Sequence, residues 1–596
     1  MENQRNLIIA IAFSVVVITL YPLIYSYFAP PTPVEEAATA SPGAESDTPT
    51  APDATSEEQA VEQAQTQPAE IRARDEVLAD TPRVPIETGR VAGSVSLVGG
   101  RIDDLILRDY RESVEPDSPN IILLSPQGSE SAYYGEFGWV ASEEGVALPT
   151  ADTVWQTDGT TLTADQPLTL TWDNGAGLVF TRTIAIDANY LFTITQSVTN
   201  NGAGPVTLYP YGLIARQGTP KTAGFFILHE GLIGVLDGSL KEIDYSDLKD
   251  DGDITLDSQG GWLGITDKYW LTALVPSQSQ NVAAGFKHIV RDNDDRYQTD
   301  FRGDAITIAP GETQSSENFF FAGAKEVRLL DKYEEEKGFP LFDRGVDWGW
   351  FYFLTKPIFY TLDFIYKYVG NFGISILLLT VLAKALFFPL ANKSYRAMSK
   401  MKALTPQMKN IREQYKDDKL RQQQEMMALY KREKVNSASG CLPILVQIPV
   451  FFALYKVLFV TIEMRHAPFF GWIKDLSAPD PTTWVNLFGL LPFEVYKEGW
   501  PNLFGLLSFD ISFLSVLDVI SIGVWPLIMG FTMWMQQRLN PTPPDPTQAR
   551  IMMLLPFIFT FMLGHFAAGL VIYWAWNNTL SIGQQRLIMW RMGVKP

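Results

Sequence analysis

Hydrophobic and polar positions follow distinct patterns along the chain, and the first pattern predicts a membrane anchor. Residues 7–28, "LIIAIAFSVVVITLYPLIYSYF", are apolar almost throughout. A helix of this length crosses a hydrocarbon core of ~30 Å. A cleaved signal peptide is the alternative, but it would have a shorter apolar region and small residues at its end. Here Arg5 is the only basic residue at the start, and aromatic residues fill the far end. We therefore predict an uncleaved transmembrane anchor over 1–28.

The next two patterns predict a linker followed by a large β domain. Residues 29–91 are rich in Pro, Ala, Glu, Ser and Thr, a composition that buries too little apolar surface to fold, so we predict a disordered linker. Residues 92–343 contain short alternating or β-branched runs such as "LVFTRTIAI" and "YLFTITQSVTN", separated by Asn, Gly, Asp and Pro. This pattern is typical of strands and turns, and it predicts a large all-β sandwich.

Residues 344–370 mix aromatic side chains with Asp347, Lys356, Asp363 and Lys367. The mixture predicts an amphipathic helix that lies in the membrane interface. A helix packed on the β sandwich is the alternative.

Five further apolar segments predict a polytopic helical core. They are 371–391 (the second transmembrane helix), 441–461, 514–537, 552–565 and 567–588. The last two are almost continuous, but one helix of about 36 residues would overshoot a bilayer, so a tight helical hairpin fits better. With the anchor, the chain is predicted to be a multi-domain membrane protein with six transmembrane helices and one all-β domain.

Charge is segregated along the chain, and the segregation predicts its topology. The net charge is −20, yet residues 29–370 carry 53 acidic and 24 basic side chains, which leaves the remainder at +9. The loop 392–440 carries twelve basic and five acidic residues, and the tail 589–596 is basic. The positive-inside rule places both, and both termini, in the cytoplasm. The β domain and the loop 462–513 then lie outside.

The basic loop has a helical pattern of its own. Met398, Met401, Leu404, Met408 and Ile411 recur at helical spacing, and a second stretch offers Leu420, Met427 and Tyr430 after a bend at "DD". We predict a cytoplasmic helical hairpin over 392–440 with one apolar seam. Its methionines either pack that seam or form an adaptable surface for apolar cargo.

The sequence contains no recognisable catalytic or metal-binding motif. It has one cysteine, four scattered histidines, no Walker loop and no nucleophile elbow. "DLKDDGD" (247–253) is only faintly like a calcium loop, because Lys249 takes a ligand position and no glutamate closes it, so we predict a surface turn. We predict no enzyme activity, no cofactor and no bound metal.

Lys384, in the apolar run "ILLLTVLAKALFFPL", is the most informative charged residue. An ammonium at the centre of a membrane helix costs ~2.5–3.5 kcal/mol on insertion scales, so something must face it. Thr380 is four residues earlier and therefore on the same helix face. Snorkelling of Lys384 to the cytoplasmic interface is the alternative.

Other predicted spans also carry polar or amphipathic side chains, namely Gln447, Gln536, Tyr573, Trp574 and Asn578. Each could be an isolated helix-packing contact, typically worth under ~1 kcal/mol. Several such residues around one buried cation instead predict a wet cavity, and no acidic residue lies within a span near Lys384.

The stretches "QEMMALYKREKVNSASGCLPILVQIPVFFALYKVL" and "EMRHAPFFGWIKDLSAPDP" resemble the YidC family of bacterial membrane protein insertases over about 344–590. The anchor and β domain resemble its Gram-negative branch. The resemblance implies a periplasmic β-supersandwich, related to sugar-mutarotase folds, and an inner-membrane core in which five helices surround a hydrophilic groove. It implies that nascent membrane proteins enter the bilayer through this groove, alone or with the Sec translocon, without a nucleotide.

The resemblance also implies roles for particular residues. A groove cation that is usually arginine corresponds to Lys384, and it attracts acidic substrate tails; Thr380, Gln447 and Trp574 match groove or substrate-contact positions. Lysine lacks the planar fork of arginine, so bidentate recognition is not carried over. A long external insert, about 482–513, is a second departure from the family pattern.

The expected partners are nascent membrane proteins, the Sec translocon with its accessory subunits, the ribosome and membrane lipids. Two other functions remain open from the residues. An anion or solute transporter would use Lys384 as its binding site, although the spans show no inverted repeat. An enzyme in the β domain would rest on the mutarotase likeness, but His229 and His288 show no paired acid in the sequence.

Overall fold

The structure is a computed structural model, and it describes residues 50–53, 71–143, 145–222, 228–291, 294–433, 442–483, 487–488, 522–540 and 546–593. The predicted anchor 1–28, most of the linker 29–91, most of the insert 482–513 and the start of the predicted span 514–537 lie outside these residues. The prediction of a disordered linker is wrong for residues 71–91, which form a helix over Arg74–Ala79 and the first strands of the β domain from Arg83 onward.

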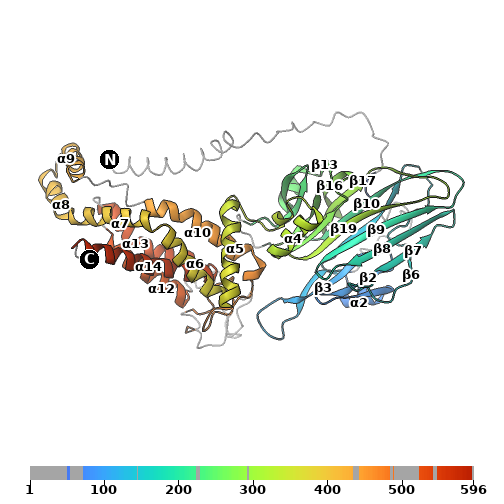
Figure 1. The fold of residues 1–596 in the computed structure, drawn as a ribbon, viewed down its shortest axis with the longest axis horizontal. Coiled ribbons are helices and arrows are strands. Elements are labelled where there is room, and N and C mark those ends of the chain that lie inside the picture. Colours follow the sequence, from blue (N-terminus) through green and yellow to red (C-terminus); the bar gives the residue numbers. More distant parts are fainter. Residues whose placement is uncertain are drawn as a thin grey trace, which may run out of the picture. The chain divides into compact units, whose positions relative to one another are not determined.

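The predicted all-β domain is confirmed as two stacked antiparallel sheets (Figure 1). The first has ten strands, in the order β1-β2-β3-β5-β10-β17-β16-β13, with β4 beside β3 and β18 beside β10. Its strands are β1 (Arg83–Glu87), β2 (Val91–Ser96), β3 (Ile102–Arg111), β4 (Asn120–Leu124), β5 (Tyr133–Ala141), β10 (Val206–Gln217), β13 (Ile254–Gln259), β16 (Asn281–Arg291), β17 (Asp294–Gly303) and β18 (Ile306–Ile308).

The second sheet has nine strands, in the order β12-β11-β14-β15-β19-β9-β8-β7-β6. They are β6 (Gln156–Thr157), β7 (Leu168–Asp173), β8 (Leu178–Ile186), β9 (Leu191–Asn200), β11 (Gly231–Leu236), β12 (Ser239–Asp244), β14 (Trp262–Thr266), β15 (Trp270–Val275) and β19 (Thr313–Ala324). Two short helices accompany the sheets, α2 (Arg74–Ala79) and α3 (Tyr245–Asp251). Helix α3 covers most of "DLKDDGD", so the prediction of a turn there is wrong.

Sequence alternation explains why these strands stack. Along β8 every second residue is buried, from Leu178 to Ile186, because successive side chains in a strand point to opposite faces. The buried sets of both sheets meet in one core with large aromatic residues such as Trp262, Phe320 and Phe321. Stacking the two sheets therefore buries the apolar side chains of each strand between them.

Helices make up the rest of the described chain (Figure 1). They are α4 (Val327–Lys337), α5 (Tyr352–Val369), α6 (Phe372–Leu386), α7 (Phe388–Ala403), α8 (Thr405–Gln414), α9 (Lys419–Arg432), α10 (Leu442–Val460), α12 (Val524–Leu539), α13 (Pro546–Leu563) and α14 (Ala568–Arg591). Short 3₁₀ turns are η2 (Phe342–Gly345) and η4 (Ile462–Met464). Met408 of α8 and Leu429 of α9 pack together beside Leu404, so the loop 392–440 contains an apolar seam. The predicted seam residues Leu420 and Met427 are instead exposed, and Met398 packs against Ile588 of α14.

The predicted span 371–391 is not one straight helix. It consists of α6 and the first turn of α7, which meet at Phe387 with a bend of 70°. Pro389 in the first turn of α7 accounts for the break, because proline has no N–H to donate to the backbone oxygen four residues earlier and its ring would clash with that oxygen in a continuous helix. Within the residues that can be described, no single helix is both long and apolar enough to cross a membrane; α6 and α7 satisfy the criterion only as this bent pair.

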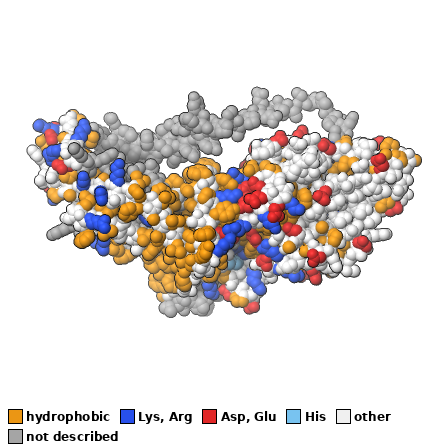
Figure 2. Space-filling model, viewed as in Figure 1, with side chains coloured by type: hydrophobic (Ala, Val, Ile, Leu, Met, Phe, Trp, Pro, Cys, Tyr) orange, Lys and Arg blue, Asp and Glu red, His pale blue; other side chains and the backbone are white. Residues whose placement is uncertain are grey.

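Exposed apolar side chains gather on the C-terminal helices (Figure 2). They include Leu378, Val381 and Leu382 on α6, Phe531 on α12, and Met553, Phe557, Ile558 and Phe561 on α13. The sandwich surface is instead mixed with acidic and basic side chains (Figure 2). A contiguous apolar surface of this size is typical of a membrane or protein contact.

Helix α5 has two different faces. One is buried and ion-paired to the preceding segment: Lys356 lies 2.8 Å from Asp331 and 2.7 Å from Asp343. The other exposes Phe353 and Tyr368, which are 72% and 78% accessible. The buried face packs on the helices α6 and α10 and is paired with α4 and η2, so the alternative of a helix packed on the β sandwich is wrong. The location in the membrane interface stays a prediction.

Candidate functional site

A cavity of about 60 Å³ lies where α6, α7, α10 and α14 converge. Its lining is mainly apolar and contains a few polar side chains. It is lined by Thr380, Ala383, Lys384, Phe387, Leu390, Ala391, Tyr395, Gln447, Val450, Tyr573 and Asn577. The cavity thus brings together four of the seven site residues predicted from the sequence: Thr380, Lys384, Gln447 and Tyr573.

Lys384 is the one charged residue in this lining, and its ammonium is held by a neutral group. Lys384 Nζ donates a hydrogen bond to Ser581 Oγ at 2.7 Å. Ser581 in turn donates to the backbone oxygen of Asn577 at 2.8 Å, so its proton is engaged and its lone pairs face the lysine. No carboxylate lines the cavity. The charge is therefore hydrogen-bonded but not neutralised.

The other lining groups offer hydrogen bonds without formal charge. Thr380 donates to the backbone oxygen of Ile376 at 2.6 Å, which leaves its oxygen available as an acceptor. The Tyr573 hydroxyl interacts with the Gln447 side chain across α14 and α10. Such a lining can hydrate a polar segment, or hydrogen-bond to it, in surroundings that are otherwise apolar.

Two residues beside the ammonium were missed by sequence analysis, namely Tyr395 in the cavity lining and Ser581, which is not part of that lining. Ser581 holds the ammonium directly, and Tyr395 on α7 interacts with the same serine. The available signal was the spacing of Asn577 and Ser581, which lie four apart and therefore on one face of α14. Tyr395 carried no signal, because it lies beyond the apolar run, in a stretch that resembles a basic loop.

The remaining three predicted residues do not reach the cavity. Trp574 packs against Phe451, with ring centroids 4.7 Å apart, and Asn578 donates to Thr532 Oγ1 at 3.3 Å across α12 and α14. Gln536 lies on α12, which contributes nothing to the lining. Consecutive helix positions are rotated by about 100°, so Trp574 and Asn578 point away when Tyr573 and Asn577 point in.

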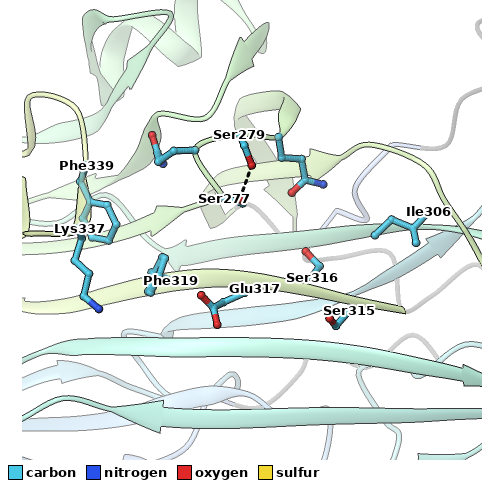
Figure 3. Close-up of a pocket in the computed structure, with 11 residues that line it drawn as sticks. Ser277, Ser279, Ile306, Ser315, Ser316, Glu317, Phe319, Lys337 and Phe339 are labelled. Atoms are coloured by element: carbon cyan, nitrogen blue, oxygen red, sulfur yellow. Dashed lines mark hydrogen bonds between the residues drawn. The ribbon is translucent and has the colours of Figure 1, made fainter. Parts of the chain in front are cut away.

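A second and larger cavity, of about 520 Å³, lies in the sandwich (Figure 3). Ser315, Glu317 and Phe319 of β19 face the loop with Ser277 and Ser279, and Lys337 and Phe339 close one end (Figure 3). The two serine hydroxyls hydrogen-bond to each other at 3.3 Å. The lining holds hydroxyls, amides, one acid and one base, but no histidine or cysteine.

The histidines of the sandwich are paired with acids, which the sequence did not reveal. His229 Nδ1 lies 3.0 Å from Asp244, and His288 Nε2 lies 2.8 Å from Asp295. Asp295 also contacts Lys249 at 2.5 Å, so its carboxylate is shared. Neither pair lines the sandwich cavity. Among the residues that the structure describes, no cluster of three potential ligands could hold a metal ion.

Comparison with known families matches two models in succession. The description "YidC periplasmic domain" covers residues 83–361, and "60Kd inner membrane protein" covers residues 364–595. A crystal structure described as an active YidC insertase with the first transmembrane domain resolved matches 84% of this chain and 94% of its own, at 16% identity and a TM-score of 0.34.

Curated relatives match over most of both chains. Membrane protein insertase YidC of Bradyrhizobium diazoefficiens is 54% identical over 537 residues, which cover 88% of this chain and 84% of the relative. The protein of the same name from Methylobacterium nodulans is 53% identical over 89% of this chain and 85% of its own. The Brucella suis relative is 52% identical over 88% and 83%.

Proposed function

This chain belongs to the YidC family of bacterial inner-membrane protein insertases, and on that premise we propose that the cavity around Lys384 receives polar, acidic segments of nascent membrane proteins as they enter the bilayer. The single observation that carries the proposal is the state of the Lys384 ammonium. It borders a mainly apolar cavity that contains a few polar groups, and it is bound by a serine hydroxyl, with no carboxylate among the described residues of the lining.

An arriving carboxylate finds a more favourable partner there than the serine offers. Attraction between unit charges is several-fold stronger at a low effective dielectric than in water, and a charge-assisted hydrogen bond is roughly twice as strong as a neutral one. Thr380 and Gln447 can hydrogen-bond to the peptide that carries the carboxylate. The cavity thereby lowers the energy of a polar tail at the point where lipid alone would raise it most.

The substrate supplies the driving force. Each Å² of apolar surface that leaves water contributes ~25 cal/mol, so a membrane-spanning helix that slides into lipid offsets the cost of moving a short polar tail. The exposed apolar residues of α6 and α13 provide a surface along which such a helix can pack. We propose no catalytic chemistry and no nucleotide for this step, and therefore a non-enzymatic protein.

Recognition by lysine is proposed to be a single-point contact. Lysine is a compact cation on a flexible stem, whereas arginine presents a planar fork that fits a carboxylate in two places. We expect this cavity to discriminate substrate tails by charge more than by the orientation of their carboxylates.

The proposed orientation follows from charge. Helices α8 and α9, which carry basic residues such as Arg412, Lys431 and Arg432, are proposed to lie in the cytoplasm with both termini. There they would meet the ribosome and anionic lipid through phosphate charge. The Sec translocon and its accessory subunits are proposed as further partners. A transporter of small anions is the second candidate from the sequence, but nothing in the comparisons favours it.

Lys384→Ala and Lys384→Glu test the proposal directly. We expect insertion of single-span substrates with acidic tails into reconstituted vesicles to fall by about tenfold or more, because a hydrogen bond to a charged group is worth ~1.5–3 kcal/mol. Lys384→Arg should retain most activity. Lys393→Ala, which removes an exposed lysine on α7, is the matched control.

The tail of the substrate provides a second control. Substrates with neutralised tails should depend much less on Lys384 than acidic ones. Equal insertion by the Lys384→Glu variant and the unaltered protein, across several acidic substrates, would refute the proposal. Uptake of small anions into vesicles by the unaltered protein would support the transporter instead.

A further inference from the structure

A four-residue stretch of the predicted linker lies against the sandwich. Residues Thr50–Asp53 are described together with the β domain, although the chain on either side of them, 1–49 and 54–70, is not described. Ala51 is only 4% accessible. An alanine in a solvated linker would be largely exposed, so the burial of Ala51 indicates that this stretch packs against the domain.

The receiving surface is the outer face of the ten-stranded sheet. Strand register puts Tyr134, Ala215, Gln298 and Lys287 side by side across β5, β10, β17 and β16. Directly paired residues in a sheet project from the same face. Tyr211 and Leu213 lie on that face too, because they alternate with Ala215 along β10. We call these six residues the docking patch.

Apolar contacts fasten the first part of the stretch. Ala51 forms a separate buried cluster with Tyr134, Tyr211, Leu213 and Ala215, which does not belong to the core between the sheets. Tyr211 is fixed in turn, because its hydroxyl donates to Glu136 at 2.9 Å and its ring covers Gly138, where a Cβ would lie 2.6 Å away. The patch therefore has a rigid apolar floor.

Polar contacts fasten the second part. Gln298 Nε2 donates to the backbone oxygen of Pro52 at 3.1 Å, and Lys287 Nζ donates to Asp53 Oδ1 at 2.7 Å. Lys287 also lies 3.5 Å from Asp300 of the neighbouring strand, so it bridges a carboxylate of the sheet and one of the linker. Successive residues Ala51, Pro52 and Asp53 thus meet β10, β17 and β16 in order.

We propose that Thr50–Asp53 is an intramolecular ligand of the docking patch and fastens the linker to the sandwich near its midpoint. The ligand chemistry is a short extended peptide with a small residue, a proline and an acid in succession. This contact is separate from the Lys384 cavity and from the proposed insertion activity.

Cross-linking in the full-length protein tests the contact. With Cys441→Ser as background, A51C/A215C should react with a short bifunctional thiol reagent about tenfold faster than the matched pair A37C/A215C, because docking raises the effective concentration of one thiol near the other. Equal rates for the two pairs would overturn the proposal.

A charge exchange adds specificity. D53K places a second cation against Lys287 and should slow A51C/A215C cross-linking to the rate of the control pair, whereas D53N should slow it less. K287D combined with D53K should restore the rate, since the exchanged lysine then faces two carboxylates. If D53K leaves the rate unchanged while the protein remains folded, the ion pair plays no part and the proposed mode of docking is wrong.

Discussion

Ser581 determines how Lys384 presents its charge. The serine hydroxyl accepts one hydrogen bond from the ammonium and donates its own proton to the backbone of Asn577. This arrangement fixes the direction of the lysine side chain while it leaves the charge in place. The position of the ammonium therefore depends on α14 as much as on α6, which carries it.

Replacing Ser581 should loosen the ammonium. We expect Ser581→Ala to lower the insertion rate of acidic-tailed substrates several-fold, since the lost hydrogen bond involves a charged group and is worth ~1.5–3 kcal/mol. Ser581→Thr keeps the hydroxyl and should retain most activity. If Ser581→Ala lowers the insertion of acidic-tailed and neutral-tailed substrates equally, the serine acts through folding and not through the lysine.

Glu463 provides a test of pH dependence outside the predicted spans. Its Oε1 accepts a hydrogen bond from the backbone N–H of Val327 at the start of α4, at 3.0 Å, while its Oε2 has no partner among the described residues. Burial, more than the nearby Glu326 and Asp363, raises the pKa of this carboxyl from 4.5 to about 8. Folding therefore favours its protonated form.

The sign of the effect follows from that direction. The stabilisation is fully present below about pH 4.5 and is lost as the pH rises through about 8, which amounts to ~5 kcal/mol at 1.36 kcal/mol for each pKa unit. We expect Glu463→Gln to flatten the decline of the melting temperature between pH 5 and 8. Glu317→Gln, at an exposed glutamate, is the control; parallel pH curves for all three proteins would contradict the assignment.

At the scale of elements, sequence analysis predicted correctly those features that depend on the order of neighbouring residues. The alternation of "LVFTRTIAI" gave β8 with its buried face, and Thr380 and Lys384 are on one face of α6, as their spacing predicted. The break at Phe387 was missed although Pro389 signalled it, because the apolar run continues through it. The partners of Lys384 were missed because Ser581 is 197 residues away, and no local pattern encodes which helices meet.

Close packing of α12 and α13 depends on the absence of a side chain. A Cβ added at Gly530 would lie 2.0 Å from Thr560 Oγ1, which itself donates to the backbone of Pro556 at 2.7 Å. We expect Gly530→Ala to cost ~1–3 kcal/mol by forcing the helices apart, and to lower the melting temperature in detergent.

Gly583 on α14 provides the matched control, because nothing lies within 4 Å of its added Cβ. Gly583→Ala should raise stability by up to about 1 kcal/mol, the usual gain from alanine over glycine in a helix. Thr560→Ala should partly restore the Gly530→Ala variant. If the two glycine substitutions behave alike, the close approach of α12 and α13 is not what requires Gly530.

At the scale of the whole molecule, the groups around Lys384 belong to the helical part of the chain. The cavity lining comes from α6, α7, α10, α14 and the α6–α7 junction at Phe387, and none of it from a strand. The buried core is nevertheless continuous, because one cluster contains Phe320 of β19 as well as Ile376 of α6 and Tyr573 of α14. Removal of the sandwich still distinguishes two hypotheses. It should abolish the activity of an enzyme located in the sandwich, whereas it should spare an insertase located in the helices.

Deleting β1–β19, residues 83–324, should leave insertion of small single-span proteins within a few-fold of the unaltered level. The deletion retains α4 and its contact with Glu463. Insertion into reconstituted vesicles measures the outcome, with correct folding of the helices checked by thermal unfolding. Complete loss of insertion in a folded deletion variant would place essential function in the sandwich.

The neutral acceptor beside Lys384 has a consequence for release as well as capture. The serine hydroxyl accepts a hydrogen bond from the ammonium but carries no net charge. The positive charge of Lys384 is therefore not neutralised, and a positive potential remains in the surrounding low-dielectric space. In the proposed function, a carboxylate would enter by replacing the serine as the hydrogen-bond partner of the ammonium, and it would leave by the reverse exchange. The ammonium would keep a partner throughout, so a bound substrate tail could be released again.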